Sequence, residues 1–81
     1  MIPKVTLYTR SGCCLCDDAK RVLLDARRRA TFDYEEIDID RDPALVAQYN
    51  DEVPVIVING SKAFKYRLTM PEFLKKLEAR S

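Results

Sequence analysis

The strongest constraint on the fold is a continuous apolar run in the second half of the chain, Val53 to Ile58, which reads Val-Pro-Val-Ile-Val-Ile. β-Branched residues without polar alternation are typical of a central strand that is buried on both faces. The Asn59-Gly60 pair that follows is a strong signal for a tight hairpin turn. We therefore expect a sheet with this strand near its centre and helices covering both of its faces.

Apolar periodicity places the other elements on either side of this run. The predicted strands are residues 5–8, 32–39, 53–58 and 62–66. Helical spacing predicts a first helix over residues 14–29. Asp42-Pro43 marks the start of a short second helix, with Asn50 near its end. A capping box at residues 69–72, Thr-Met-Pro-Glu, starts a third helix.

This order, β-α-β-α-β-β-α, predicts an α/β fold in a single domain that spans residues 1–81. A right-handed crossover makes the first two strands parallel, and the hairpin adds two more, so the four-stranded sheet is mixed. Phe32 and Tyr34 have the opposite parity to Ile37 and Ile39, so we expect the second strand to bend, bulge or start late. The stripe of the first helix that is expected to face the sheet is Leu15, Ala19, Val22, Leu23 and Ala26.

Composition argues against several classes of protein. Apolar residues make up 47% of the chain and charged residues 33%, as in ordinary globular domains. The formal net charge of +1 is small for a dedicated nucleic-acid surface. No apolar run is long enough to span a membrane, and no targeting segment is visible. Three closely spaced cysteines suit thiol chemistry in a reducing compartment, so we expect a cytoplasmic protein without nucleic-acid or membrane partners.

Two of the cysteines, Cys13 and Cys16, form a C-x-x-C pair between the first predicted strand and the first predicted helix. At such a junction the first sulfur points at the helix N-terminus, where unpaired N–H groups and the helix dipole favour thiolate over thiol. The thiolate is the nucleophile of thiol–disulfide exchange. The second cysteine lies one turn further on, on the same helix face, and can attack a mixed disulfide. The chain has no histidine, which excludes Cys-His catalysis and histidine metal ligands.

The same cluster of thiols admits a second interpretation. Cys13, Cys14 and Cys16 could together hold a soft metal such as Cu(I) or zinc. They could also supply ligands to an iron–sulfur cluster that two protomers share. Cys14 itself is either a third redox participant or an exposed variable position within the motif.

The element order, the C-x-x-C at the first strand–helix junction and the Val-Pro pair before the buried run resemble the glutaredoxin branch of the thioredoxin superfamily. The resemblance covers nearly the whole chain. It is most specific at residues 8–16, Tyr-Thr-Arg-Ser-Gly-Cys-Cys-Leu-Cys, and at Val53-Pro54. It implies a thioredoxin-like fold of the glutaredoxin type, with Cys13 as the nucleophilic thiol and Cys16 as the resolving thiol.

The resemblance also implies substrate-binding roles for Arg10, Val53 and Pro54. Arg10 matches a basic position that glutaredoxins often use to support the thiolate and a glutathione carboxylate. Pro54 matches the cis-proline of the superfamily, so the bond between Val53 and Pro54 is expected to be cis. The backbone at this bond would face the Cys13 sulfur and pair with an extended, peptide-like substrate.

The chain departs from dithiol glutaredoxins at two places. Cys14-Leu15 stands where they usually carry Pro-Tyr or Pro-Phe. After the hairpin turn, residues 64–67, Phe-Lys-Tyr-Arg, replace the Gly-Gly and Asp that receive the γ-glutamyl end of glutathione. Lys65 and Arg67 are either charges that protect an edge strand from aggregation or recognition groups for an acidic thiol partner. The Cys-x-Leu-Cys pattern looks most like a compact glutaredoxin-like family.

We therefore expect a thiol–disulfide oxidoreductase that uses the Cys13–Cys16 pair to reduce or exchange disulfides, with a role in cell redox homeostasis. Its expected partners are a disulfide-containing protein or a small thiol, with glutathione among the candidates, and a reductase that the sequence does not identify. No organic cofactor is expected. The alternatives are a metal or iron–sulfur carrier that uses Cys13, Cys14 and Cys16, and a thioredoxin-fold interaction module with little catalysis.

Overall fold

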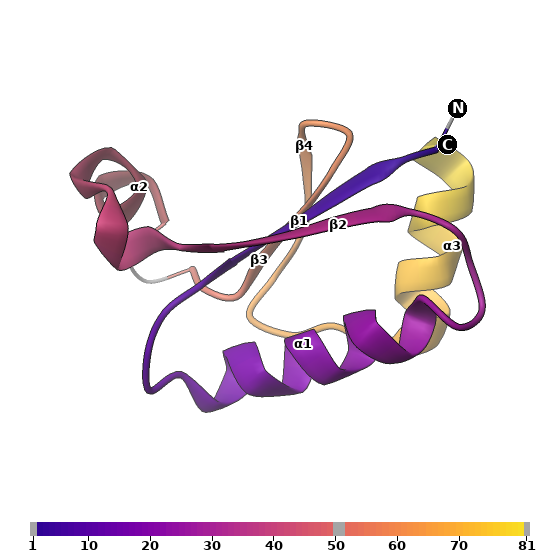
Figure 1. Cartoon of the computed structure of the whole chain (residues 1–81), viewed down its shortest axis with the longest axis horizontal. Helices are drawn as coiled ribbons and strands as arrows, with labels where there is room; N and C mark the ends of the chain where they lie inside the picture. Colours follow the sequence, from indigo (N-terminus) through magenta and orange to yellow (C-terminus); the bar gives the residue numbers. More distant parts are fainter. Residues whose placement is uncertain (1, 50–51, 81) are drawn as a thin grey trace.

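The centre of the molecule is a four-stranded sheet in the order β2-β1-β3-β4, seen in a computed structural model that describes residues 2–49 and 52–80. β1 and β2 are parallel, and β3 is antiparallel to both β1 and β4. The mixed sheet predicted from the sequence is therefore confirmed (Figure 1). The strands are β1 (Lys4–Thr9), β2 (Asp33–Asp38), β3 (Val55–Ile58) and β4 (Ser61–Lys65).

Helices cover both faces of the sheet, as expected for a central strand without polar residues. β3 is buried at all of its positions. α1 and α3 share one core with the sheet, whereas a short 3₁₀ turn, η1, and α2 contribute to a second core on the other side. The helical elements are α1 (Cys14–Ala26), η1 (Ile39–Arg41), α2 (Pro43–Tyr49) and α3 (Met70–Arg80).

The larger core lies between the sheet and the pair α1 and α3. Alternate residues of a strand point to the same face, so every second residue of β1 and β3 contributes to it. The Phe73 ring of α3 meets the Phe32 ring edge-on, with centroids 5.4 Å apart. The residues of this core that are fully shielded from solvent are Val5, Leu7, Leu23, Ala26, Ile56, Ile58 and Phe73.

The smaller core holds α2 and η1 against the opposite face. Ile39 and Tyr49 pack there against Val55 and Val57 of β3. The Tyr8 ring of β1 stacks on the Tyr49 ring, with centroids 4.6 Å apart. This stack ties α2 to the last residues of β1, immediately before the cysteine-bearing loop.

Several predicted boundaries differ from the structure by one to three residues. α1 ends at Ala26, not at residue 29, because the backbone tightens there: Arg28 N–H donates to the Asp25 carbonyl at 3.1 Å and Arg29 N–H to the Ala26 carbonyl at 2.9 Å. β2 starts late, at Asp33, one of the outcomes expected from the parity of its side chains.

The other differences concern single positions. Leu15 was expected to face the sheet, but its side chain is 37% exposed, and Cys16 is buried in its place. β3 begins at Val55, two residues after the Val53 start predicted from the apolar run. β4 ends at Lys65 because Tyr66 adopts a left-handed backbone with φ of 69°.

Two turn signals are confirmed in detail. Asn59 and Gly60 have φ values of 52° and 85°, as the tight turn between antiparallel strands requires. The Asp42 side chain accepts a hydrogen bond from Ala44 N–H at 2.9 Å, so it caps α2 as predicted. The predicted position of Asn50 lies outside the described residues.

The start of β1 and the end of α3 lie at one end of the molecule, and the start of α1 lies at the other (Figure 1). Ile2, Pro3, Leu77 and Glu78 line the same surface hollow, which confirms that the two chain ends are neighbours.

Candidate dithiol site

Cys13 stands at the N-cap of α1, after a loop that leaves the end of β1. Gly12 turns the chain there with φ of 75°, a left-handed conformation that glycine adopts without steric cost. Cys13 has an extended backbone, and its sulfur accepts a hydrogen bond from Cys16 N–H at 3.2 Å. The sulfur therefore occupies the position in which a helix N-terminus stabilises negative charge. This is the placement that the C-x-x-C at a strand–helix junction predicts.

The thiols differ in access to solvent. Cys13 is half-buried, Cys14 is exposed, and Cys16 is 2% exposed. Burial, together with the hydrogen bond to the Cys13 side chain, raises the pKa of Cys16 to about 11, although hydrogen bonds with the Thr9 side chain and the Arg10 backbone oppose this rise. Cys16 is therefore a neutral thiol near pH 7, placed beneath a more accessible sulfur.

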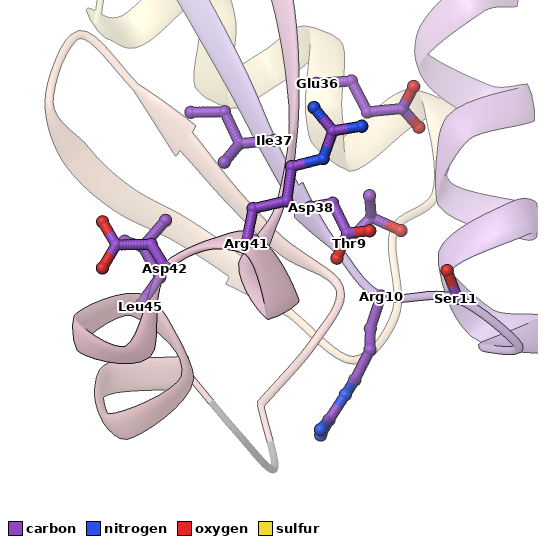
Figure 2. A pocket seen from close by; sticks show the side chains of 9 residues that line it. All are labelled: Thr9, Arg10, Ser11, Glu36, Ile37, Asp38, Arg41, Asp42 and Leu45. Carbon is purple, nitrogen blue, oxygen red and sulfur yellow. The ribbon is translucent and has the colours of Figure 1, made fainter.

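Arg10 lies on the β2 side of this loop, where its side chain is engaged by an acidic residue. Its Nε atom is 3.1 Å from Oδ1 and 3.3 Å from Oδ2 of Asp40 in η1. Figure 2 shows its side chain pointing away from Glu36 and Arg41. The Arg10 backbone is thus hydrogen-bonded to Cys16, while the guanidinium group of the same residue pairs with Asp40 in this conformation.

A hollow of about 640 Å³ opens beside Arg10, between the end of β1, β2 and α2 (Figure 2). Both acidic and basic side chains line it, including Glu36, Asp38 and Arg41. Glu36 is already paired with Lys20 at 3.2 Å, and the Asp38 side chain accepts from Asp40 N–H at 3.0 Å. The polar groups of this hollow are thus largely used in holding β2, η1 and α1 together.

Val53 and Pro54 lie at the same end of the sheet as the cysteines. Tyr8 of β1 is opposite Val55 of β3, so this antiparallel register places Pro54 beside Thr9. The bond between Val53 and Pro54 is cis, as the family resemblance implies, and Pro54 is fully buried. The Pro54 carbonyl accepts a hydrogen bond from Tyr66 N–H at 2.9 Å.

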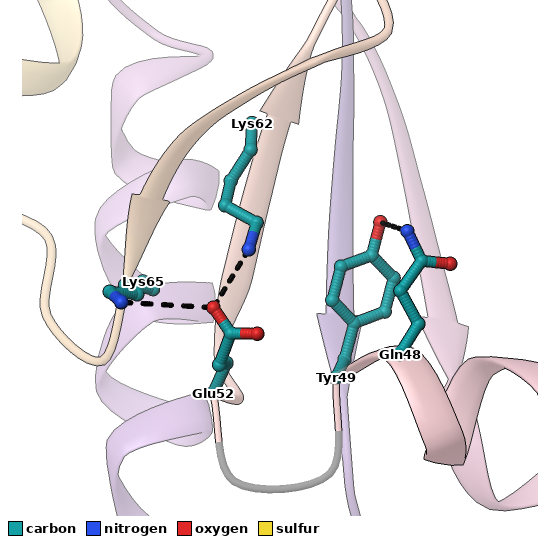
Figure 3. A network of polar contacts seen from close by, with 5 residues as sticks. All are labelled: Gln48, Tyr49, Glu52, Lys62 and Lys65. Carbon is teal, nitrogen blue, oxygen red and sulfur yellow. Dashed lines mark hydrogen bonds and ion pairs between the residues drawn. The ribbon is translucent and has the colours of Figure 1, made fainter.

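A polar network before this bond was not predicted from the sequence. The Glu52 carboxylate is 2.7 Å from the Lys62 ammonium and 3.8 Å from that of Lys65, both on β4 (Figure 3). The hydrogen bond from Lys62 lowers the pKa of Glu52. The Lys62 ammonium also lies 5.6 Å from the centre of the Tyr49 ring, whose hydroxyl accepts from Gln48 at 3.2 Å. Two lysines, Lys62 and Lys65, on an expected edge strand were the only sequence signal for this arrangement.

The arrangement of the thiols does not match a metal site. Across residues 2–49 and 52–80, no three His, Cys, Asp or Glu side chains come together in a way that could hold one metal ion. Cys14 is exposed whereas Cys16 is buried, so the three cysteines do not form a common ligand set in this conformation.

None of the helices in the described ranges has the length and apolar character to cross a bilayer.

The fold and the dithiol at a helix N-terminus define a thioredoxin-fold protein of the glutaredoxin type. A family model described as "Glutaredoxin-like domain (DUF836)" matches residues 4–78. The chain belongs to this glutaredoxin-like family.

Comparison with individual proteins agrees with this assignment. The chain is 38% identical over 78 residues to the glutaredoxin-like protein NrdH of Escherichia coli, covering 91% of this chain and 88% of that protein. An uncharacterized protein of Mycobacterium tuberculosis is 33% identical over 63 residues, which are 72% of this chain and 65% of that protein's length. The chain thus spans about two thirds of its mycobacterial relatives.

Solved structures show the same fold. An X-ray structure of a structural-genomics target protein from X. campestris has a TM-score of 0.79 at 32% identity and covers 95% of this chain and 99% of that one. Reduced thioredoxin pre-protein of Schistosoma mansoni has a TM-score of 0.75 at 13% identity, covering 99% of this chain and 80% of that one. At that identity the second comparison shows the thioredoxin fold alone.

Proposed function

We propose that this protein is a thiol–disulfide oxidoreductase, with Cys13 as the attacking thiol, Cys16 as the resolving thiol and a role in cell redox homeostasis. One observation supports this proposal most directly. The half-buried Cys13 sulfur accepts the Cys16 N–H at the start of α1, while the Cys16 thiol is buried one turn further on. An accessible sulfur stabilised by a helix N-terminus, next to a shielded second thiol, suits sequential attack by two cysteines.

The first step forms a mixed disulfide. The Cys13 thiolate attacks one sulfur of a substrate disulfide, so a bond forms between Cys13 and that sulfur. The substrate disulfide bond breaks, and the departing thiolate takes up a proton. Because the pKa of Cys16 is raised to about 11, this thiol retains its proton at neutral pH until the mixed disulfide has formed.

The second step releases the substrate. The Cys16 sulfur gives up its proton and attacks Cys13, the mixed disulfide breaks, and the second substrate thiolate leaves and takes up a proton. The substrate gains two electrons and two protons, and the protein ends as the Cys13–Cys16 disulfide. A dithiol reductase, or two molecules of a thiol such as glutathione, then returns the pair to its reduced form.

The remaining site residues have binding roles in this proposal. Val53 and Pro54 offer backbone at the cysteine end of the sheet, where an extended substrate segment can pair with it. The Arg10 guanidinium pairs with an anionic group of the substrate or with the Cys13 thiolate. To do so, its side chain must leave Asp40. An Asp40→Asn variant would weaken this ion pair and is a direct way to test the exchange.

The defining experiment is intact-mass measurement of the purified protein across glutathione redox buffers, after a metal analysis of the same sample. We expect a reversible loss of two hydrogens, with a midpoint between about −180 and −270 mV. Cys13→Ser should abolish turnover, Cys16→Ser should accumulate the mixed disulfide, and Cys14→Ser serves as the matched control that retains turnover. Full activity of Cys13→Ser would contradict the mechanism.

The alternatives predict different results in the same experiment. A carrier would show tightly bound metal or visible absorbance and no reversible disulfide. An interaction module would fold normally but would not cycle between dithiol and disulfide at any buffer potential.

A further inference from the structure

A hollow beside the dithiol is lined by two conspicuously exposed apolar side chains. In the described part of the chain, four large apolar residues are exposed, and two of these, Leu15 at 37% and Tyr66 at 42%, line the same hollow of about 360 Å³. Ala19 and Leu68 add further apolar surface to it. Apolar side chains that gather at one exposed depression, rather than scattering singly, mark a binding surface.

The position of this hollow links it to both halves of the candidate site. Leu15 lies between Cys13 and Cys16 at the start of α1. Tyr66, on the opposite wall, donates its N–H to the Pro54 carbonyl at 2.9 Å. Figure 1 shows the segment between β4 and α3 passing along α1, and the shared hollow confirms this contact. A polypeptide held by a disulfide to Cys13 is therefore attached two residues before Leu15, at the end of α1 that borders this hollow.

The backbone at Tyr66 gives a second, independent indication. Its φ of 69° lies in the left-handed region, which is sterically unfavourable for a bulky residue and free of cost for glycine. Internal packing does not account for a tyrosine there, because its ring is exposed and its polar neighbour is the Lys65 ammonium, 5.5 Å from the ring centre. Unfavourable backbone conformations of this kind are concentrated at functional sites.

The charges on the two walls determine the orientation of a polypeptide bound in the hollow. The Tyr66 wall carries the exposed side chain of Arg67, and the α1 wall carries the exposed carboxylate of Asp18. A carboxylate of the occupant is attracted to the first wall and repelled by the second. The apolar floor between the walls accepts an apolar side chain.

We infer that this hollow selects polypeptide disulfides in which the reacting half-cystine has a large apolar neighbour, followed by a carboxylate that meets Arg67. The inference rests on the proposed oxidoreductase function and specifies its substrate class. Glutathione is a poorer occupant because it has no large apolar side chain to cover Leu15 and Tyr66.

Single-turnover reduction tests this inference. Prereduced protein, freed of reductant, is mixed with an excess of a symmetrical peptide disulfide and quenched with acid, and the released peptide thiol is measured. The two main peptides differ only in the residue before cysteine, which is leucine in one and serine in the other. Both carry a glutamate further along. We expect the leucine peptide to react about tenfold faster than the serine peptide, as for burial of one apolar group in a binding pocket. Glutathione disulfide should also react more slowly than the leucine peptide.

Variants locate the source of the preference. Leu15→Ser, and separately Tyr66→Gly, should bring the ratio of the two rates close to one. Glycine fits the backbone at position 66, so the second variant retains the fold. Leu24→Ser is the matched control, because Leu24 is 45% exposed on the same helix and lies outside the hollow. Arg67→Gln should slow the glutamate-containing leucine peptide about threefold relative to its glutamine analogue, whereas Arg28→Gln should not.

The outcomes separate this inference from the proposed function. Equal rates for the leucine and serine peptides would overturn the inference and leave the oxidoreductase intact. Faster reaction with glutathione disulfide than with the leucine peptide would also overturn it. If none of the disulfides is reduced, the proposed function fails, and the inference fails with it.

Discussion

The buried Cys16 thiol makes the stability of the reduced protein depend on pH in a specific way. Burial raises its pKa from the ordinary value of 9.0 to about 11 in the folded protein. The unfolded chain therefore loses this proton at lower pH than the folded chain does. The stabilisation is fully present below pH 9 and is lost as the pH rises through 11. We expect alkaline conditions to destabilise the fold through the ionisation of this thiol.

The size of the effect follows from the two pKa values. Each unit of difference corresponds to about 1.4 kcal/mol, so the full loss is about 3 kcal/mol, and about 2 kcal/mol of it is reached by pH 11. Cys16 is only 2% exposed, so solvent screening weakens this effect little. A loss of this size is a large part of the stability of a small domain.

Urea unfolding of the reduced protein at pH 8, 9, 10 and 11 measures this dependence. Burial also raises the pKa of Tyr34 to about 12 and, to a lesser extent, that of Tyr8, so both tyrosines add to the alkaline loss in every variant. Cys16→Ala should show a loss smaller than that of the wild type by about 2 kcal/mol. Cys14→Ala, at an exposed cysteine, should behave as the wild type. Parallel curves for Cys16→Ala and wild type would refute the reasoning.

Three further changes test the packing, the turn and the polar network. Phe73→Ala should destabilise the domain by about 3–5 kcal/mol in urea, because a fully buried ring leaves a cavity between α3 and the sheet. Gly60→Ala should cost about 1–2 kcal/mol at φ of 85°, a purely conformational penalty because no atom beyond the adjacent residues lies within 4 Å of the added carbon. Glu52→Gln should be less stable than wild type at neutral pH, and this difference should vanish as the pH falls below the ordinary carboxyl pKa of 4.5; a constant difference would contradict the Lys62 contact.

The sequence determines the order and partners of the strands more firmly than the ends of the helices. Residues 55–58 are apolar at every position, so a central location is the only one that buries them all. In α1, two sets of positions fit a helical stripe: residues 15, 19, 22 and 26, and residues 16, 19, 23 and 26. The structure uses the second: Cys16 is buried whereas Leu15 remains at the surface. Composition alone does not distinguish these two arrangements.

In the candidate site, too, some features follow from the local sequence and others depend on tertiary contacts. The N-cap position of Cys13 follows from local sequence, because a strand, a glycine turn and a helix succeed one another within a few residues. The ion pair between Arg10 and Asp40 joins residues far apart in the chain and depends on how η1 docks beside β1. The same holds for Glu52 and Lys62, which only the β3–β4 hairpin brings together. Contacts of this kind require the tertiary structure.

The separation between the chain ends and the start of α1 has a practical consequence. A polypeptide fused before β1 or after α3 emerges at the end of the sheet opposite Cys13 (Figure 1). Fusion at either end therefore adds bulk far from the cysteines and leaves the approach of a large substrate unobstructed. A fluorescent redox reporter, or an immobilising tag for capturing mixed disulfides on Cys16→Ser, can be attached at either terminus with the same access to the dithiol.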